Sequence, residues 1–465
     1  MLRFGTDGIR GVANAELTPE LALALGRAAA RRLQGREFLV GRDTRRSGPM
    51  LQGALSAGLA SEGARVVDVG VLPTPGLAWL AAARGVPGAM ISASHNPFPD
   101  NGIKLLSPTG TKLSDALERA VEEELDQVLL SGPGAGLPAG AGVGAVVEEL
   151  SAVAAYEEHL VRSVDLGGSS LRVVCDCANG AASTVAPRVL GRLGVDAYVV
   201  AAEPDGTNIN DGCGSTHATA LAGLVIEAHA DLGICFDGDA DRLIALDRNG
   251  VVVDGDQLLA LFAIDLDERG QLDNRAMVAT VMSNLGLRRS LGARGIGLVE
   301  TPIGDRYVAD ALEEHRLVLG GEQSGHIVFR REATTGDGLL TALKLLELVA
   351  RRSTPLDVLA AGAMSRLPQE LRNVPVVEPE RLGAAVAVWA EVTAVEADLG
   401  SSGRVLLRAS GTEAAVRVMV EAESHERAAS AVEQLAAIVE RELGRSDEGS
   451  SEEGRSADPT AGPVQ

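Results

Sequence analysis

Residues 171–200 read LRVVCDCANGAASTVAPRVLGRLGVDAYVV, and this stretch carries the pattern that decides the fold class. In it, a short apolar run precedes a helical pattern near Ala182–Leu193 and a second apolar run at Asp196–Val200. A helical pattern near Thr216–His229 and a third apolar run at Leu232–Phe236 follow. Short apolar strands that alternate with helices of about ten residues indicate βαβ units and mainly parallel sheets. The sequence therefore predicts an α/β fold.

The same alternation occurs on both sides of this stretch, so the chain has three α/β blocks. The last part of the chain differs, because it has two strand-like runs, Gly403–Ala409 and Ala415–Glu421, and a long helical pattern at His425–Leu443. This order predicts a smaller α+β domain. The outer α/β blocks have strand-like runs at Phe38–Val40, Arg65–Val69, Gly88–Ser92, Met277–Val281, Gly295–Val299 and Leu317–Leu319.

Local composition marks three further segments. Thr18-Pro19-Glu20 is typical of a helix start, because Thr caps a helix and Pro suits its first position. Residues 131–144 are rich in Gly, Ala and Pro, which predicts a flexible loop. Residues 446–465 consist mostly of Ser, Gly, Asp, Glu and Pro. They offer too little apolar surface to fold, so we expect a disordered acidic tail.

The overall composition argues against several classes of protein. The chain has 465 residues with 42 basic and 64 acidic side chains, a net charge of −22. Nucleic acids and anionic membranes attract basic faces, so this balance argues against both as partners. The sequence has no apolar run of about 18 residues and no apolar core of a signal peptide at its start. With four cysteines and no secretion signal, we expect a cytoplasmic protein with free thiols.

A possible nucleophile lies in Ser92-Ala93-Ser94-His95-Asn96-Pro97, directly after an apolar run, where α/β sheets place their sites. The G-x-S-x-G turn of serine hydrolases is absent. Two interpretations therefore remain, a polar turn that ends at Pro97 or a serine that carries a phosphoryl group. Lys104 follows and is one of only three lysines. Its amine suits acid–base chemistry, although a surface lysine is the plainer alternative.

A possible metal site lies in Asp237-Gly238-Asp239-Ala240-Asp241-Arg242, between two apolar runs. Three carboxylates at alternate positions of a loop can converge on one point, and such oxygen ligands suit Mg²⁺ or Ca²⁺. An EF-hand is excluded, because Arg242 and Arg248 occupy the positions where that loop needs Gly and Glu. The alternative is a solvated acidic turn, in which the carboxylates would repel one another without a cation.

Two further loops carry side chains suited to a sugar phosphate. Residues 320–326 (GGEQSGH) can offer Glu, Ser and His to sugar hydroxyls. Residues 408–413 (RASGTE), with Arg417 beyond them, offer guanidinium and hydroxyl groups to a phosphate. A surface loop and an ordinary hairpin are the respective alternatives, and no P-loop motif is present. Together the four motifs suit a reaction that moves phosphate between two ends of a sugar.

These motifs make the chain similar to the α-D-phosphohexomutase superfamily, from Phe4 to about Leu443. Within it, the sequence resembles the bacterial phosphoglucosamine mutase branch more than the phosphomannomutase/phosphoglucomutase branch. The forms SASHNP, GEQSGH and TVMSNLG (residues 280–286) favour that branch. The motifs that carry the resemblance occur in the superfamily's order: Phe4-Gly5-Thr6-Asp7-Gly8-Ile9-Arg10-Gly11, Ser92–Pro97, Asp237–Arg242, Glu322–His326 and Ser410–Glu413.

The resemblance implies four domains around a central cleft, three related α/β domains with mixed sheets and a smaller C-terminal α+β domain. We expect their limits at residues 1–146, 147–250, 251–364 and 365–445, followed by the tail. The implied reaction interconverts glucosamine 6-phosphate and glucosamine 1-phosphate through a phosphoserine and a 1,6-bisphosphate, and supplies UDP-N-acetylglucosamine synthesis. The implied partners are a hexosamine phosphate and an unnamed activating kinase or bisphosphate donor. A homodimer is an option that the sequence leaves open.

Residue roles follow from the resemblance by position. Ser94 would be the phosphoserine that activates the enzyme, and Ser94 with Asp237, Asp239 and Asp241 would hold one Mg²⁺ per subunit. Arg10, His95 and Lys104 would line the reacting end, with Lys104 in an acid–base role. The remaining roles concern the substrate: Arg242, Glu322, Ser324 and His326 would contact the sugar, and Arg408, Ser410, Gly411, Thr412 and Arg417 would bind its non-reacting phosphate.

One departure and two alternatives accompany the resemblance. Ala414 stands where the family usually has Pro, which frees one φ angle in the phosphate loop without removing a phosphate contact. The nearer alternative is a phosphomannomutase or phosphoglucomutase, because no isolated motif distinguishes an amine at C2 from a hydroxyl. The other alternative is a non-catalytic sugar-phosphate binding protein.

Overall fold

A computed structural model describes residues 2–5, 7–33, 35–130, 136–410 and 414–444. The predicted tail, part of the loop at 131–144, and Gly411 and Thr412 lie outside these residues. The chain forms two compact units. The first comprises Met1–Ser283 and Leu287–Ser365, and the second comprises Asn284–Gly286 and Arg366–Gln465. Every described helix is too short or too polar to cross a membrane.

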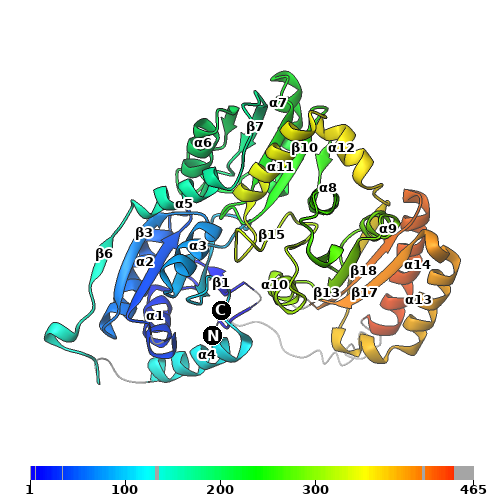
Figure 1. Cartoon of the computed structure of the whole chain (residues 1–465). Helices are drawn as coiled ribbons and strands as arrows, with labels where there is room; N and C mark the ends of the chain where they lie inside the picture. The colour runs from blue at the N-terminus through cyan, green and yellow to red at the C-terminus, as the bar shows by residue number, and fades with distance from the viewer. Residues whose placement is uncertain (1, 6, 34, 131–135, 411–413, 445–465) are drawn as a thin grey trace, which may run out of the picture. The chain divides into compact units, whose positions relative to one another are not determined.

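The first sheet has six strands in the order β1-β5-β4-β2-β3-β6 (Figure 1). β4, β2, β3 and β6 are parallel, whereas β5 is antiparallel to both of its neighbours. Alternate residues of its strands face two different cores: Phe38 packs with α1, α2 and α4, and Leu39 packs with α3. The bounds are β1 Ile9–Val12, α1 Pro19–Leu33, β2 Glu37–Arg42, α2 Gly48–Ser61, β3 Arg65–Val71, α3 Thr74–Arg84, β4 Gly88–Ile91, β5 Asp100–Leu106, α4 Asp115–Leu130, η1 Gly140–Gly142 and β6 Val146–Glu148.

The predicted helix start at Thr18 is confirmed. α1 begins at Pro19, and the Thr18 hydroxyl accepts a hydrogen bond from the Leu21 N–H at 3.3 Å. Pro19 lacks an N–H and therefore loses nothing in the first turn, where backbone N–H groups have no helical partner.

The second sheet has the order β11-β10-β9-β7-β8, with β8, β7 and β9 parallel and β10 and β11 antiparallel. The helix predicted near Thr216–His229 is wrong in its first half, because His217 has a non-helical backbone and the segment splits into η2 and α7. The bounds are α5 Ala152–Arg162, β7 Arg172–Asp176, α6 Ala182–Arg192, β8 Asp196–Val200, η2 Ser215–Leu221, α7 Ala222–Glu227, β9 Leu232–Phe236, β10 Leu243–Asp247 and β11 Val252–Val253.

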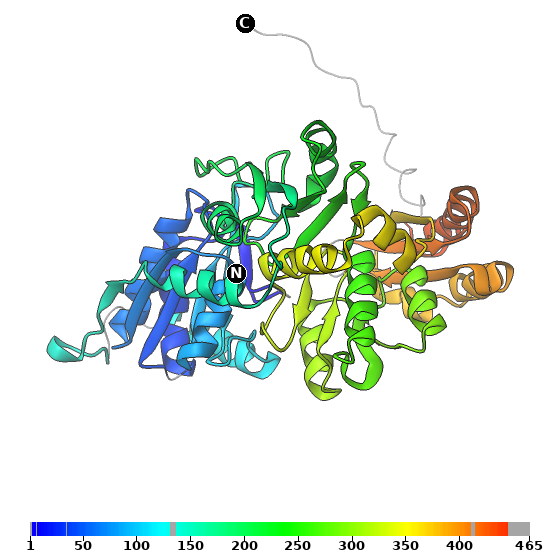
Figure 2. The same ribbon diagram turned by 45° about the horizontal axis from the view of Figure 1, so that its top comes forward.

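The third sheet has the order β13-β12-β14-β15, in which only β15 is antiparallel to its neighbour. Figure 2 shows α8 and α11 of this part of the chain beside each other. One buried apolar cluster contains Met90, Phe236 and Met277 from the first, second and third sheets, so the three sheets share a core. The bounds are α8 Gly255–Glu268, η3 Asp273–Arg275, β12 Ala276–Thr280, α9 Leu285–Ala293, β13 Gly297–Thr301, α10 Asp305–Glu314, β14 Leu319–Gly321, β15 Ile327–Phe329, α11 Gly338–Arg352 and α12 Leu356–Ala363.

The second unit has an antiparallel sheet in the order β16-β18-β17. The helices α13 and α14 pack with it around a separate core that includes Val418 and Leu435. The prediction of three α/β domains with mixed sheets and a smaller C-terminal α+β domain is therefore confirmed. The bounds are β16 Gln369–Pro375, η4 Pro379–Ala384, α13 Val386–Leu399, η5 Gly400–Ser402, β17 Arg404–Ala409, β18 Ala415–Glu421 and α14 His425–Leu443.

Candidate active site

Ser94 lies just beyond β4 with its side chain directed at the predicted metal loop. Its hydroxyl donates a hydrogen bond to Asp237 Oδ2 at 2.6 Å, and His95 Nδ1 lies 3.2 Å from Ser94 Oγ. Ser94 is only 1% exposed and has a φ of +51°, a left-handed conformation that is uncommon for a residue with a side chain. Such a backbone persists only where the surroundings fix it, and it is typical of functional positions.

The serine loop, residues 92–100, is fixed by the buried guanidinium of Arg45. Its Nη1 donates to the carbonyls of Pro97 and Asp100, and its Nη2 donates to those of Ser94 and Asn96, at 2.5–3.0 Å. The Arg45 Nε donates to Asp43 Oδ2 at 2.9 Å. All five N–H donors of Arg45 are thus used, four by carbonyls of the serine loop and one by Asp43, and none is left for a ligand.

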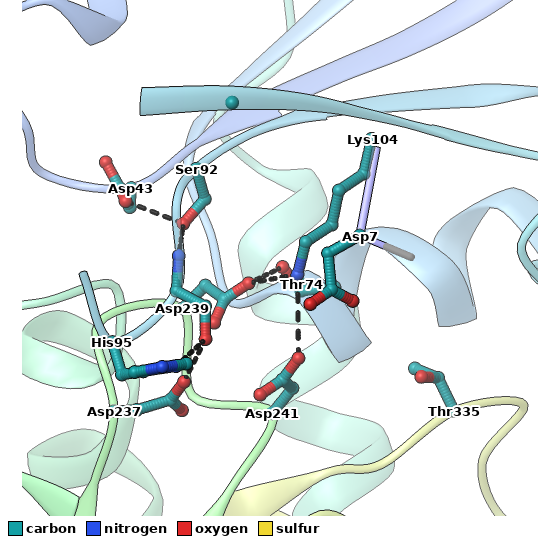
Figure 3. Close-up of polar contacts among 12 residues, drawn as sticks. Asp7, Asp43, Thr74, Ser92, His95, Lys104, Asp237, Asp239, Asp241 and Thr335 are labelled. Carbon is teal, nitrogen blue, oxygen red and sulfur yellow. Dashed lines mark hydrogen bonds and ion pairs between the residues drawn. The ribbon is translucent and has the colours of Figure 1, made fainter. Parts of the chain in front are cut away.

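Asp43 and Asn210 complete this support. The Ser92 hydroxyl donates to Asp43 at 2.7 Å and accepts from the Ser94 N–H at 3.0 Å, as Figure 3 shows for Asp43 and Ser92. From the second sheet's domain, the Asn210 amide donates to the carbonyls of Ser94 and Asn96 at 2.9 and 3.0 Å. Sequence reasoning missed Asp43 and Arg45, although a charged pair directly after a buried strand was the available signal.

The metal loop, residues 237–241, follows β9 and brings three buried carboxylates together. Asp237, Asp239 and Asp241 each offer an oxygen within 4.8 Å of the others (Figure 3). Burial and the other two carboxylates raise the pKa of Asp237 well above its ordinary value. The loop therefore concentrates negative charge at a point that excludes water, which makes a cation favourable there.

The unpaired oxygens of this cluster fit a metal ion. Asp239 Oδ1 and Asp241 Oδ1 are buried and have no hydrogen-bond partner, although buried acceptors normally have one. Carboxylate oxygens are the ligands that Mg²⁺ prefers. The chemistry of the donors and the two orphaned oxygens therefore agree with a divalent cation site.

Lys104 on β5 supplies the positive charge nearest to the triad. Its Nζ lies 2.9 Å from Asp239 Oδ2 and 3.6 Å from Asp241 Oδ2. Burial alone would lower the pKa of Lys104, but the two carboxylates raise it above its ordinary value. Burial alone would raise the pKa of Asp239, but Lys104 and the Thr74 hydroxyl, 2.7 Å away, hold it below its ordinary value. Lys104 therefore keeps its proton in this arrangement.

Two predicted arginines flank the cluster. Arg10 Nη2 lies 3.0 Å from Asp7 Oδ2, while the Arg10 Nε is buried without a partner. The Nε of Arg242 lies 3.8 Å from Asp241 Oδ1 and is likewise buried without a hydrogen-bond partner. Buried guanidinium donors without partners are costly unless an acceptor such as a phosphate oxygen satisfies them.

The predicted sugar loop joins β14 to β15 and contacts the start of β10, the strand that follows the metal loop. The Leu243 N–H donates to the Gly325 carbonyl at 3.0 Å. Gly325 has a φ of +89°, and a Cβ there would lie 2.0 Å from the Leu243 oxygen, so only glycine fits. Glu322 Oε1 accepts from the Gly304 N–H at 3.1 Å, and Ser324 Oγ is buried without a partner. The first unit thus brings the serine, metal and sugar loops together.

The predicted phosphate loop belongs to the second unit. Arg408 on β17 lies directly opposite Arg417 on β18, and burial and Arg417 lower the pKa of Arg408. The Arg417 Nε is buried without a partner, and the Ser410 N–H donates to the Ala415 carbonyl at 2.8 Å. Two facing guanidinium groups repel each other, which an anion between them would relieve. Gly411 and Thr412 lie outside the described residues.

Family models match the chain in four consecutive parts. Phosphoglucomutase/phosphomannomutase α/β/α domains I, II and III match residues 1–130, 154–250 and 254–367, and the C-terminal domain of the same family matches residues 371–438.

Curated relatives and solved structures extend this match. The chain is 50% identical to phosphoglucosamine mutase of Frankia alni over 95% of this chain and 98% of the relative. It is 52% identical to phosphoglucosamine mutase of Symbiobacterium thermophilum, over 90% and 94% of the two chains. The crystal structure of a phosphoglucomutase/phosphomannomutase family protein from Burkholderia thailandensis has a TM-score of 0.78 at 25% identity, covering 95% of this chain and 96% of that one. The chain therefore belongs to the phosphoglucomutase/phosphomannomutase family, the phosphohexomutases, and its bacterial relatives at about 50% identity are phosphoglucosamine mutases.

Proposed function

We propose that this protein is a phosphoglucosamine mutase that interconverts glucosamine 6-phosphate and glucosamine 1-phosphate through a phosphorylated Ser94. The observation that carries the proposal is the buried Ser94 hydroxyl 2.6 Å from Asp237 at the edge of the carboxylate triad. The relatives named above support the amino sugar as the substrate. The reaction is an intramolecular phosphoryl transfer in net terms, with a hexosamine 1,6-bisphosphate as the intermediate.

In the transfer, the bond between Ser94 Oγ and phosphorus breaks while a sugar hydroxyl oxygen bonds to phosphorus. The sugar hydroxyl gives its proton to His95 Nδ1, and this proton then moves to Ser94 Oγ, where it replaces the phosphoryl group. Burial, together with Arg242 and Arg10, lowers the pKa of His95 to about 4. Its Nδ1, 3.2 Å from Ser94 Oγ, therefore stays a neutral acceptor for that proton near neutral pH. After the bisphosphate reorients, its other phosphoryl group returns to Ser94.

The charged side chains near Ser94 balance the phosphoryl group. Asp237, Asp239 and Asp241, with a phosphoryl oxygen on Ser94, would hold Mg²⁺, which when bound neutralises charge on the transferring group. Lys104, predicted as an acid–base group, stays protonated because the adjacent carboxylates raise its pKa, so we assign it to hydrogen-bond donation toward the reacting oxygens and not to proton abstraction. The unpartnered Arg10 and Arg242 donors are suited to the phosphoryl oxygens, and Arg408, Ser410 and Arg417 to the non-reacting phosphate.

We propose the domain limits 1–146, 147–250, 251–364 and 365–445, and Glu322, Ser324 and His326 as the readers of sugar hydroxyls. We also propose a cytoplasmic enzyme, with which the four free cysteines agree. Activation would require a kinase or a bisphosphate donor that first phosphorylates Ser94.

The test is a coupled assay of the 6-phosphates of glucosamine, glucose and mannose. We expect the highest kcat/KM for glucosamine 6-phosphate, and a loss of at least about 10⁴-fold in Ser94→Ala, because the variant has no phosphoryl carrier. Intact mass of the wild type should show one phosphate that Ser94→Ala lacks. A preference for glucose or mannose phosphate would overturn the substrate assignment. Full turnover in Ser94→Ala, or no turnover and no phosphate in the wild type, would overturn the phosphoserine mechanism.

A further inference from the structure

The imidazole of His326 is held by a turn that the sequence analysis did not single out, residues 334–338 (TTGDG). The Gly336 N–H points at His326 Nε2 from 3.2 Å, and His326 is only 3% exposed. The Thr335 hydroxyl lies 3.5 Å and Asp305 Oδ2 lies 3.9 Å from the same nitrogen, both farther than the Gly336 N–H. Because a backbone N–H can only donate, Nε2 accepts this nearest bond and carries the lone pair. The neutral ring then carries its proton on Nδ1, and that nitrogen is buried without a partner. One buried N–H donor is thus left for a ligand.

Position 336 requires glycine because the imidazole of His326 leaves no room for a side chain, and not because the turn needs a special backbone conformation. A Cβ there would lie 2.4, 2.5 and 2.6 Å from Cδ2, Nε2 and Cγ of His326, which are its three nearest atoms. The φ of Gly336 lies outside the left-handed region, so alanine could adopt the same backbone. Any side chain at this position would therefore displace the His326 ring while leaving the turn intact.

The same turn also touches the metal loop and the other domains of the first unit. The Gly338 N–H donates to the Ala240 carbonyl at 3.0 Å, and a Cβ at Gly338 would lie 2.3 Å from the Arg242 oxygen. The Thr334 hydroxyl donates to the Gly110 carbonyl at 2.8 Å, and Asp337 accepts from the Tyr156 hydroxyl at 2.8 Å. The imidazole is therefore fixed from a rigid support that also holds the metal loop in place.

We propose that Gly336 is a positioning residue that fixes the Nδ1–H tautomer of His326 and aims this donor at a hydroxyl oxygen of the sugar. The inference deepens the proposed function and rests on it for the identity of the ligand. A donor needs a lone pair on its partner, and a protonated amine has none. The His326 donor therefore reads a ring hydroxyl, and the C2 ammonium group of glucosamine must find its acceptor elsewhere.

A double-mutant cycle tests this proposal. Gly336→Ala should lower kcat/KM for glucosamine 6-phosphate by about 10-fold or more, mainly through KM. In a His326→Ala background, where no ring obstructs the new methyl group, the same substitution should change kcat/KM less than twofold. Gly292→Ala is the matched control, because a Cβ there would meet no atom within 4 Å apart from its chain neighbours and the backbone of its own helix, and it should leave kcat/KM unchanged. Equal losses from Gly336→Ala in both backgrounds would overturn the proposal.

The tautomer itself is measured without substrate or turnover. Nitrogen-15 spectra of the histidine-labelled protein should show His326 with a protonated Nδ1 and a bare Nε2, assigned by the signal lost in His326→Ala. An Nε2–H tautomer would overturn the proposal even in an active enzyme. If the tautomer is as expected but the glucosamine phosphates are not substrates, the substrate assignment fails and the support of His326 by Gly336 stands.

Discussion

The serine loop and the metal loop face each other across a single hydrogen bond, yet they are stabilised in opposite ways. Both follow the end of a buried strand, and both contain a residue with positive φ, Ser94 at +51° and Ala240 at +57°. In the serine loop, the backbone carbonyls are satisfied by the buried donors of Arg45 and Asn210. In the metal loop, two buried carboxylate oxygens are satisfied by nothing in the described chain.

The serine loop therefore fixes the position of a side chain, whereas the metal loop holds unbalanced charge. The serine loop is a rigid support that presents one hydroxyl, and its cost is the strained backbone of Ser94. The metal loop holds three carboxylates against the ammonium of Lys104 and the guanidinium of Arg242, so it keeps an excess of negative charge for a cation to neutralise. Changes to the first loop should therefore alter the rate of transfer, and changes to the second should alter the need for metal.

Among substitutions that keep Ser94, neutralising a metal-loop carboxylate should give the largest effect. We expect Asp241→Asn to lower kcat about 10²- to 10³-fold at low Mg²⁺ concentration, because it removes one of the three carboxylate ligands. Part of the loss should return at high Mg²⁺ concentration. Since the substitution relieves repulsion among buried carboxylates, the metal-free variant should unfold at a temperature no lower than the wild type. Titration of activity with Mg²⁺ after treatment with EDTA measures the first effect, and calorimetry the second.

Full wild-type activity after complete removal of divalent metal would contradict the role of Asp237, Asp239 and Asp241 as ligands. A strongly destabilised Asp241→Asn would show instead that the carboxylate stabilises the fold through its ion pair with Lys104, 3.6 Å away.

Weakening the support of the serine loop should give a smaller effect with a different signature. Arg45→Lys replaces five donors in a fixed fork with one ammonium, so Ser94 should lose its defined position. Because misplacement by about 1 Å costs up to about 10²-fold in rate, we expect kcat to fall 10- to 100-fold. The Mg²⁺ concentration for half-maximal activity should stay within twofold of the wild type.

The matched control is Arg46→Lys, since Arg46 is the exposed neighbour of Arg45. It should keep wild-type kinetics. A shift in the Mg²⁺ requirement of Arg45→Lys, with kcat unchanged at saturating metal, would contradict the separation of the two loops.

The smallest effect concerns the pH dependence of stability at the turn that supports the metal loop. Burial raises the pKa of Asp337 to about 6 in the folded protein, above its ordinary value of 3.8. The folded state therefore binds this proton more tightly than the unfolded state, and stability is lost as pH rises from about 4 through 6. Asp337→Asn removes this titration but can keep the cap of α11, where Asp337 Oδ1 accepts from the Leu340 N–H at 2.9 Å.

Urea unfolding at pH 5 and pH 8 measures this effect. Relative to the wild type, Asp337→Asn should gain about 1 kcal/mol more stability at pH 8 than at pH 5. An advantage that is the same at both pH values, or larger at pH 5, would contradict a raised pKa at Asp337.

The sequence allowed both loops to be located because their chemical groups are contiguous. Ser92, Ser94 and His95 lie within four residues of one another, and the three aspartates alternate along five residues. Each group follows an apolar strand, so composition and periodicity sufficed to locate it. Arg45 and Thr74 were not found, because they act on loops 49 and 165 residues away in the chain. Gly336 is only ten residues from His326, but it belongs to no chemically unusual run. The helix predicted near Thr216–His229 failed for a related reason: the apolar spacing was present, but the backbone at His217 is not helical.

The three lysines have a consequence beyond the site. Lys104 pairs with Asp239, Lys112 with Asp7 and Asp305, and Lys344 with Glu332 and the Ser163 carbonyl, and their side chains are 4–16% exposed. Nearly all positive charge at the surface is arginine. Reagents that acylate ε-amines should thus react very little with the lysines of the native protein. The amount of acylated lysine would then measure the fraction of molecules that have unfolded, locally or completely.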